Sequence, residues 1–167
     1  MDSLSKDNFI IDKTRTEILR NQLVLIEPVG SRLKLQGFED LPKAGSIAMG
    51  DPESVPAGKY AYGACLSLGI WDEIKDLVVY GKDVTEVLTW VASGNADAGM
   101  VYLTEAGLTD QVRTVAFAPG DSHSKIIYCA ALVKGSKEEK AGTELINYLT
   151  SPKVQKIFLS YGFLPVD

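Results

Sequence analysis

The sequence predicts an α/β protein with a mostly parallel sheet flanked by helices, and three observations lead to this expectation. Strand-like and helix-like segments alternate along the chain, which is the order that parallel sheets require. Leu23–Ile26 and Ile126–Val133 are unbroken apolar runs, typical of strands that are buried on both faces. The chain has 167 residues, of which 46% are hydrophobic, and this is enough to bury a core.

The first strong helix is expected to open at Pro56. It follows a short apolar strand, Ile47–Met49, and a turn at Asp51 and Pro52. Small side chains line one face of this helix, so that it can lie close against a sheet, and Gly69 is expected to end it. A strand, a loop and a helix start in this order present free backbone N–H groups to an anion.

A second strong helix is expected over Val84–Ser93. Asp83 is a good N-cap, and Glu86, three residues further on, completes a capping box. Two further strands are expected at Ala98–Tyr102 and at Val112–Ala118, because both are largely apolar and bounded by loop residues.

The two ends of the chain are expected to be helical. Residues 1–20 are polar with sparse apolar positions and predict helical pieces. Ser136 and Ser151 mark the starts of two closing helices, and Pro152 occupies the favoured first position of the last one.

Charge and composition exclude several classes of protein. The net charge of −5 argues against a nucleic-acid surface, which needs a basic patch. No apolar run approaches the roughly 20 residues that a membrane helix needs. The first residues are polar and show no signal peptide, so these features alone predict a cytosolic chain.

The residues that usually carry catalysis or metal binding are few. Cys65 and Cys129 form no CxxC motif, which rules out an ordinary cysteine zinc site. Buried free thiols are expected, and a disulfide between the two is left open. The single histidine, His123, lies in a polar loop and is expected to be solvated. We therefore expect a protein that is not an enzyme and holds no metal.

Three positions are candidates for an anion site. The helices that start at Ala57 and Val84 each follow a strand, and each offers first-turn N–H groups and the positive end of a helix dipole. Tyr102, at the end of its strand, brings a phenolic O–H donor to the same edge of the sheet. Plain packing is the competing interpretation, because most helix starts bind nothing and most strand-end tyrosines are half-buried.

The chain resembles the periplasmic molybdate-binding proteins of ABC importers over essentially its whole length. The pattern GDPxxVPAG at Gly50–Gly58 and the pattern ADAGxVY at Ala96–Tyr102 together form a specific signal. The likeness continues in other segments, namely Thr14–Arg15, Asn21–Ile26, Leu68–Asp72, Asp83–Val84, Asp121–His123 and Tyr161–Phe163.

The resemblance implies a type II periplasmic-binding-protein-like fold, three-layered (αβα), with two lobes that close on a tetrahedral oxyanion. It implies that molybdate, or tungstate, is held by the backbone N–H groups of Ala57 and Val84 and by the hydroxyl of Tyr102, without a cofactor. It also implies a periplasmic or extracellular-side protein, monomeric in the family, that offers its ligand to a membrane permease.

The same resemblance implies that part of the first lobe is missing from this chain. Residues 1–22 and 134–167 would be a remnant of lobe 1, and residues 23–133 would be the hinge strands and a complete lobe 2. Two serines that complete the family's oxyanion cage would precede Met1. The expectation is therefore half a site, weak binding, and dimerisation through exposed apolar surface.

A different class of protein is kept as the alternative. The effector-binding domain of a bacterial transcription regulator can share the two-lobed fold, although it would need an attached helix-turn-helix, and the chain has no such segment.

Overall fold

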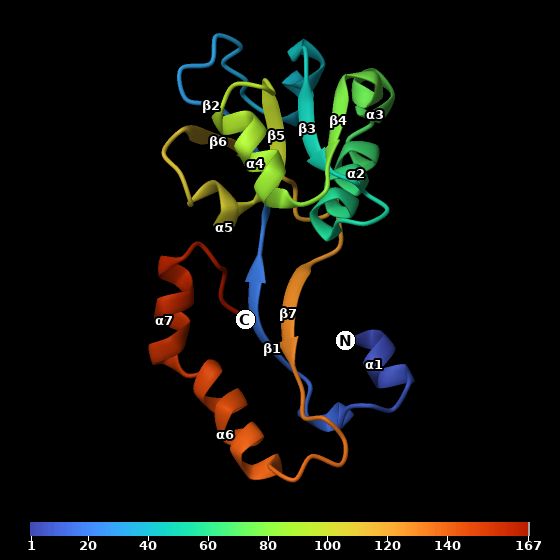
Figure 1. Ribbon diagram of the computed structural model, residues 1–167, viewed down its shortest axis with the longest axis vertical. Helices are drawn as coiled ribbons and strands as arrows, with labels where there is room; N and C mark the ends of the chain where they lie inside the picture. The colour runs from blue at the N-terminus through green and yellow to red at the C-terminus, as the bar shows by residue number, and fades with distance from the viewer. Residues whose placement is uncertain (167) are drawn as a thin grey trace. The chain divides into compact units, whose positions relative to one another are not determined.

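The computed structural model describes residues 1–166, which form two compact units (Figure 1). Residues 22–125 make up one continuous unit, the central unit. Residues 1–21 and 126–166 make up the other, the terminal unit. The chain therefore passes from one unit to the other twice, once after Asn21 and once after Lys125.

The central unit is built on a five-stranded sheet with the strand order β4-β3-β5-β2-β6. Strands β3, β4 and β5 are mutually parallel, whereas β2 runs antiparallel to both of its neighbours, β5 and β6. Four strands therefore point one way and β2 points the other, so the sheet is mixed but mostly parallel in direction. The strands are β2 (Leu23–Pro28), β3 (Ile47–Gly50), β4 (Val78–Gly81), β5 (Ala98–Tyr102) and β6 (Val112–Phe117).

Two helices cover opposite faces of this sheet. Helix α2 (Pro56–Ser67) puts Cys65 against Met100 of β5, with 3.8 Å between the two sulfur atoms. Helix α4 (Val84–Ala92) lies against the preceding residue of β5, since a Cβ added to Gly99 would come within 2.6 Å of Val91 Cγ2. Successive residues of a strand point to opposite faces. The central unit is thus three-layered, and the predicted α/β class is confirmed.

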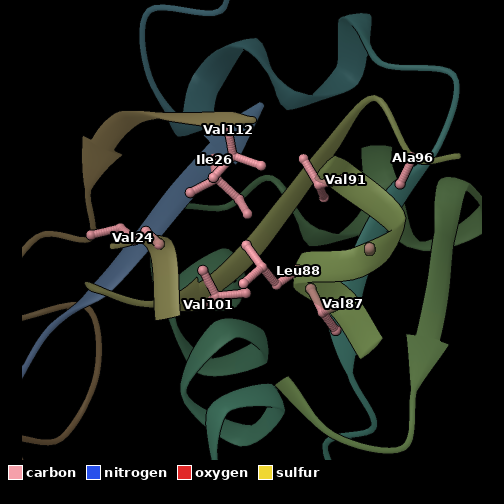
Figure 2. Packing of buried hydrophobic residues seen from close by; sticks show 10 residues of the cluster. Val24, Ile26, Val87, Leu88, Val91, Ala96, Val101 and Val112 are labelled. Carbon is pink, nitrogen blue, oxygen red and sulfur yellow. The ribbon is translucent and has the colours of Figure 1, made fainter. Parts of the chain in front are cut away.

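The core between α4 and the sheet is made of small and β-branched side chains (Figure 2). Val87, Leu88 and Val91 of α4 face Val24 and Ile26 of β2 and other strand residues, and most of them are fully buried. Their spacing is the helical one that the sequence predicts. Burial of such side chains stabilises a fold by roughly 1.5–3 kcal/mol each, so this layer holds α4 firmly in place.

A buried ion pair ties the loop after β2 to the sheet. Glu27 is 1% exposed, and its carboxylate accepts hydrogen bonds from Arg113 Nε of β6 at 2.8 Å and from the Leu35 amide at 3.2 Å. Arg113 also donates to the Leu35 carbonyl at 3.0 Å. Sequence reasoning missed this pair, because the two residues lie 86 positions apart.

The remaining elements of the central unit are short. They are the 3₁₀ segments η2 (Phe38–Lys43) and η3 (Lys75–Leu77) and the helices α3 (Trp71–Ile74) and α5 (Leu103–Ala106).

The terminal unit contains a two-stranded antiparallel sheet of β1 (Thr16–Asn21) and β7 (Ile126–Ala130). The prediction of helical pieces over residues 1–20 is wrong for β1. It holds only for α1 (Asp2–Lys6) and the 3₁₀ turn η1 (Asp12–Thr14). Strand β1 forms because β7, more than a hundred residues away, supplies its hydrogen-bond partners, and no local pattern reveals such a partner.

Two helices close the terminal unit, as predicted. Helix α6 (Glu139–Leu149) begins three residues after Ser136, with Glu138 as its N-cap residue, and α7 (Pro152–Ser160) has Ser151 as its N-cap residue. No residue of α6 is buried, although its Leu145 and Tyr148 are apolar. Helix α6 packs on β1 and α7, but Leu145 and Tyr148 remain more than half exposed, so part of its apolar surface is left uncovered by the described residues of this unit.

Candidate functional site

The structure brings the three predicted positions to one edge of the central sheet. Because β4, β3 and β5 are adjacent and parallel, their carboxyl ends lie at the same edge. Helix α2 starts after β3, α4 starts after β4, and Tyr102 is the last residue of β5. Ala57, Val84 and Tyr102 therefore come from three neighbouring strand ends, which is where open α/β sheets bind ligands.

The loop between β3 and α2 satisfies its own backbone through Asp51. The Asp51 carbonyl accepts from the amides of Ser54 (3.2 Å) and Val55 (2.7 Å), and its carboxylate accepts from the Glu53 amide (3.0 Å). The Asp51 amide itself donates to the Gly81 carbonyl at 3.0 Å. The loop amides are therefore not available to an anion, and the donors that remain are those of the first turn of α2.

Ala57 carries such a donor. It is the second residue of α2, after Pro56, which has no N–H group. Within residues 1–166 the Ala57 amide has no hydrogen-bond acceptor, although the residue is only 1% exposed. More than nine in ten buried backbone N–H groups in proteins are paired, so an unpaired buried amide at this position is a candidate donor to a ligand.

Gly58 sets how closely α2 begins beside β3. A Cβ added to Gly58 would lie 1.9 Å from the Gly50 carbonyl oxygen, which no side chain tolerates. The absence of a side chain therefore lets the first turn of α2 approach the end of β3 closely, and this places the Ala57 amide at the edge of the sheet.

The start of α4 is built in a similar way. Asp83 Oδ1 accepts from the Glu86 amide at 2.8 Å, and Glu86 Oε2 accepts from the Lys82 amide at 2.8 Å. The predicted N-cap is thus confirmed, with the reciprocal bond made to Lys82 instead of to Asp83. The amide of Val84, the first residue of the helix, has no acceptor among the described residues.

An aromatic row extends from Tyr102 across α2. The Tyr60 ring lies 6.4 Å from the ring of Tyr102 and 5.6 Å from that of His123, between centroids. Tyr60 and His123 line a cavity of about 400 Å³ beside the first turns of α2. Val55, Lys59 and other side chains from positions 52–63 and 123–124 complete its lining. Ala57, Val84 and Tyr102 do not line this cavity.

His123 is half-buried, so the expectation of a solvated side chain is wrong. Its Nδ1 donates to the Ser124 carbonyl at 2.8 Å, and its Nε2 is covered and has no partner within the described part of the chain. Sequence reasoning gave Tyr60 and His123 no role in the site, although His123 belongs to the likeness segment Asp121–His123. Only one signal could have pointed to Tyr60, which follows Ala57 by three residues and so lies one helical turn further on.

The arrangement suits binding of a small anion better than chemistry. Two helix dipoles, each equivalent to roughly half a charge, point their positive ends at the edge where Tyr102 lies. Among residues 1–166 no cluster of His, Cys, Asp and Glu could hold a metal ion. Neither does this part of the chain contain a helix with the length and apolar character of a membrane span.

Both cysteines are free thiols, so the disulfide that the sequence left open is not formed. Cys65 is buried between α2 and the sheet, whereas Cys129 in β7 is half-buried.

The fold, together with the Ala57 and Val84 amides that have no acceptor among the described residues, is typical of a protein that binds solutes. A family model described as "Bacterial extracellular solute-binding protein" matches residues 1–164, and the chain belongs to this family. The family is one of binding proteins, in agreement with the expectation of a protein that is not an enzyme, and it lends no support to the regulator alternative.

Particular relatives share much of the sequence. The chain is 42% identical over 160 residues to the "Putative ABC transporter substrate-binding lipoprotein YvgL" of Bacillus subtilis, covering 96% of the chain and 62% of that protein. It is 35% identical over 168 residues to the molybdate-binding protein ModA of Haemophilus influenzae, covering 98% of the chain and 66% of that protein. The chain thus spans a little under two thirds of the length of these two relatives.

A solved structure resembles the chain throughout. It is described as the "substrate binding domain of putative molybdenum ABC transporter from Clostridium difficile" and superimposes with a TM-score of 0.90 at 38% identity. The match covers 100% of this chain and 73% of that one.

Proposed function

We propose that this chain is the oxyanion-binding part of the substrate-binding component of an ABC importer, and that its ligand is molybdate or tungstate. The ligand is held by the backbone N–H groups of Ala57 and Val84 and by the hydroxyl of Tyr102. No cofactor takes part, since the anion itself is the cargo.

One observation carries the proposal. Two helix-start amides, those of Ala57 and Val84, have no acceptor among the described residues and lie at the same sheet edge as Tyr102. Neutral N–H and O–H donors suit a fully ionised oxyanion, because they need no counter-charge and select by donor geometry. The names of the Haemophilus and Clostridium proteins support molybdenum oxyanions over other tetrahedral anions.

The wider role follows from the family. In an ABC importer the protein acts outside the cytoplasm and delivers the anion to a membrane permease. Residues 23–133 supply the hinge strands and one lobe with its share of the cage, and residues 1–22 and 134–167 supply part of the other lobe. We expect weak binding by this chain alone, because it supplies only a share of the cage. Each donor to a charged ligand that is not supplied forgoes roughly 1.5–3 kcal/mol of binding free energy.

Titration of the ¹⁵N-labelled chain by NMR tests the proposal even when binding is weak. Adding sodium molybdate is expected to shift the amide signals of Ala57 and Val84 first and most, and tungstate is expected to do the same. Sulfate serves as the comparison anion, and a smaller response to sulfate is expected. If no amide signal at either helix start responds to molybdate or tungstate, the proposed site is wrong.

Tyr102→Phe tests the phenolic donor. The substitution keeps the ring and removes the hydroxyl, so molybdate affinity is expected to fall about ten- to a hundredfold. Tyr62→Phe is the matched control, because Tyr62 is on α2 and packs edge-on against Trp71 at 4.8 Å. An unchanged affinity in Tyr102→Phe would remove Tyr102 from the site.

A further inference from the structure

Tyr60 stands in the central unit where three separate segments meet. Its ring contacts Tyr102 at the end of β5, with an interplanar angle of 58°. It also contacts His123 in the loop before β7, with an interplanar angle of 59°. Both contacts fall in the range of centroid separations and tilts that aromatic pairs prefer.

His123 gives the row a fixed end. The hydrogen bond from its Nδ1 to the Ser124 carbonyl restricts rotation of the imidazole ring. Its Nε2 is covered, so the ring is held by packing as well. The ring of Tyr60 contacts both this ring and that of Tyr102, and the two contacts restrain it.

The cavity beside α2 makes the Tyr60 ring sensitive to removal. Tyr60 and His123 line a space of about 400 Å³, so removing the Tyr60 ring would enlarge a space that already exists there. The Tyr102 ring, which is half-buried, would then lose a neighbour and gain room to move. A donor to a small anion must be held to within about half an ångström of its productive position.

We propose that Tyr60 is a positioning residue for Tyr102, and that His123 supports Tyr60 from the loop before β7. Tyr60 itself does not touch the anion. This inference rests on the proposed role of Tyr102 as a donor to the oxyanion. It adds a residue that decides how well that donor is aimed, and hence how tightly the anion is held.

The test compares Tyr60→Leu with two matched variants of the same helix. Tyr60→Leu is expected to weaken molybdate binding about three- to tenfold, the worth of one aromatic contact. Tyr60→Phe keeps the ring and is expected to stay within about twofold of the unsubstituted chain. Tyr62→Leu removes a ring that packs on Trp71 and is expected to have as little effect. Equal losses in Tyr60→Leu and Tyr62→Leu would overturn the proposal.

A double-mutant cycle separates positioning from general loss of structure. If Tyr60 acts through the Tyr102 hydroxyl, Tyr60→Leu should cause almost no further loss of affinity in a Tyr102→Phe background. The same loss in both backgrounds would show that Tyr60 acts through the stability of the unit, and the proposal would be wrong.

A measurement without ligand distinguishes this inference from the proposed function. ¹³C relaxation of the labelled tyrosine rings should show a more mobile Tyr102 ring in Tyr60→Leu than in Tyr60→Phe. Unchanged Tyr102 mobility overturns the positioning role whatever molybdate does. A mobile Tyr102 ring in a chain whose Ala57 and Val84 amides ignore molybdate would refute the proposed function and leave the positioning of Tyr102 by Tyr60 standing.

Discussion

At the scale of single residues, the contact of Gly58 with the Gly50 carbonyl fixes the start of α2 against β3. The GDPxxVPAG pattern therefore marks the family likeness and also has a steric explanation. Pro56 pre-sets the first helical position, Asp51 takes up the loop amides, and Gly58 permits the close approach. Ala57, between Pro56 and Gly58, has a first-turn amide without an acceptor in residues 1–166.

Gly58→Ala is expected to lower the free energy of unfolding by about 1–3 kcal/mol, because the new Cβ forces α2 away from β3. Gly63→Ala on the same helix is the matched control. Its Cβ would meet only the Ser122 carbonyl oxygen, at 4.0 Å, so this change is expected to be neutral or to stabilise by up to about 1 kcal/mol. Urea unfolding followed by circular dichroism measures both. Equal unfolding midpoints for the two variants would contradict the close approach.

The two thiols are expected to differ sharply in reactivity. Burial raises the pKa of the Cys65 thiol to about 12, so that at pH 8 only about one molecule in ten thousand carries the reactive thiolate. A chromogenic disulfide reagent at pH 8 should therefore modify Cys129 in the folded chain and leave Cys65 intact. Denaturation should release the second equivalent. Cys129→Ser should abolish the fast phase, and two fast equivalents in the folded chain would contradict the burial of Cys65.

At the scale of elements, α4 shows how a helix start is both stabilised and kept available. Asp83 and Glu86 accept hydrogen bonds from the amides of Glu86 and Lys82, and the amide of Val84 has no acceptor in the part of the chain that the structure describes. The Val87, Leu88 and Val91 face holds the helix on the sheet. Local capping thus fixes where the helix begins, and packing fixes where its start points.

Asp83→Ala is expected to destabilise the central unit by about 1 kcal/mol, because the Glu86 amide loses its acceptor. Asp83→Asn retains an oxygen acceptor at the cap and should be much closer to the unsubstituted chain. Urea unfolding measures the difference. If Ala and Asn at this position unfold at the same midpoint, the cap seen in the structure does not contribute to stability.

The elements differ in how far local sequence specifies them. The boundaries of α4 follow from Asp83, Glu86 and Gly94, and the prediction agrees with the structure to within a residue. Strand β1 does not follow from any local signal, since its stability comes from pairing with β7. The Glu27–Arg113 pair and the Tyr60–His123 contact are likewise long-range, and no periodicity reveals them.

At the scale of the whole molecule, the terminal unit carries large apolar side chains that its described residues leave about half exposed. The exposed large ones on its two closing helices are Leu145, Tyr148, Ile157 and Leu159. A two-stranded sheet with partly packed helices is marginal on its own. Exposed apolar surface of this kind favours association.

We therefore expect the chain to self-associate as its concentration rises, as measured by sedimentation velocity. Leu145→Lys, which places a charge on α6, should shift the equilibrium towards the monomer. Leu108→Lys is the control, because Leu108 is 72% exposed but belongs to the central unit. A sedimentation coefficient independent of concentration, or an equal effect of the two lysine substitutions, would contradict association through the closing helices.

The sequence by itself determined the alternation of strands and helices, the starts of α2 and α4, and Tyr102 at a strand end. These are local features, and caps, glycines and apolar periodicity specify them directly. Only the tertiary structure decided that β4, β3 and β5 are adjacent and parallel, that Gly58 meets Gly50, and that Tyr60 joins Tyr102 to His123. Strand order and side-chain contacts depend on pairing between distant segments, and that pairing turns separate helix starts into one candidate site.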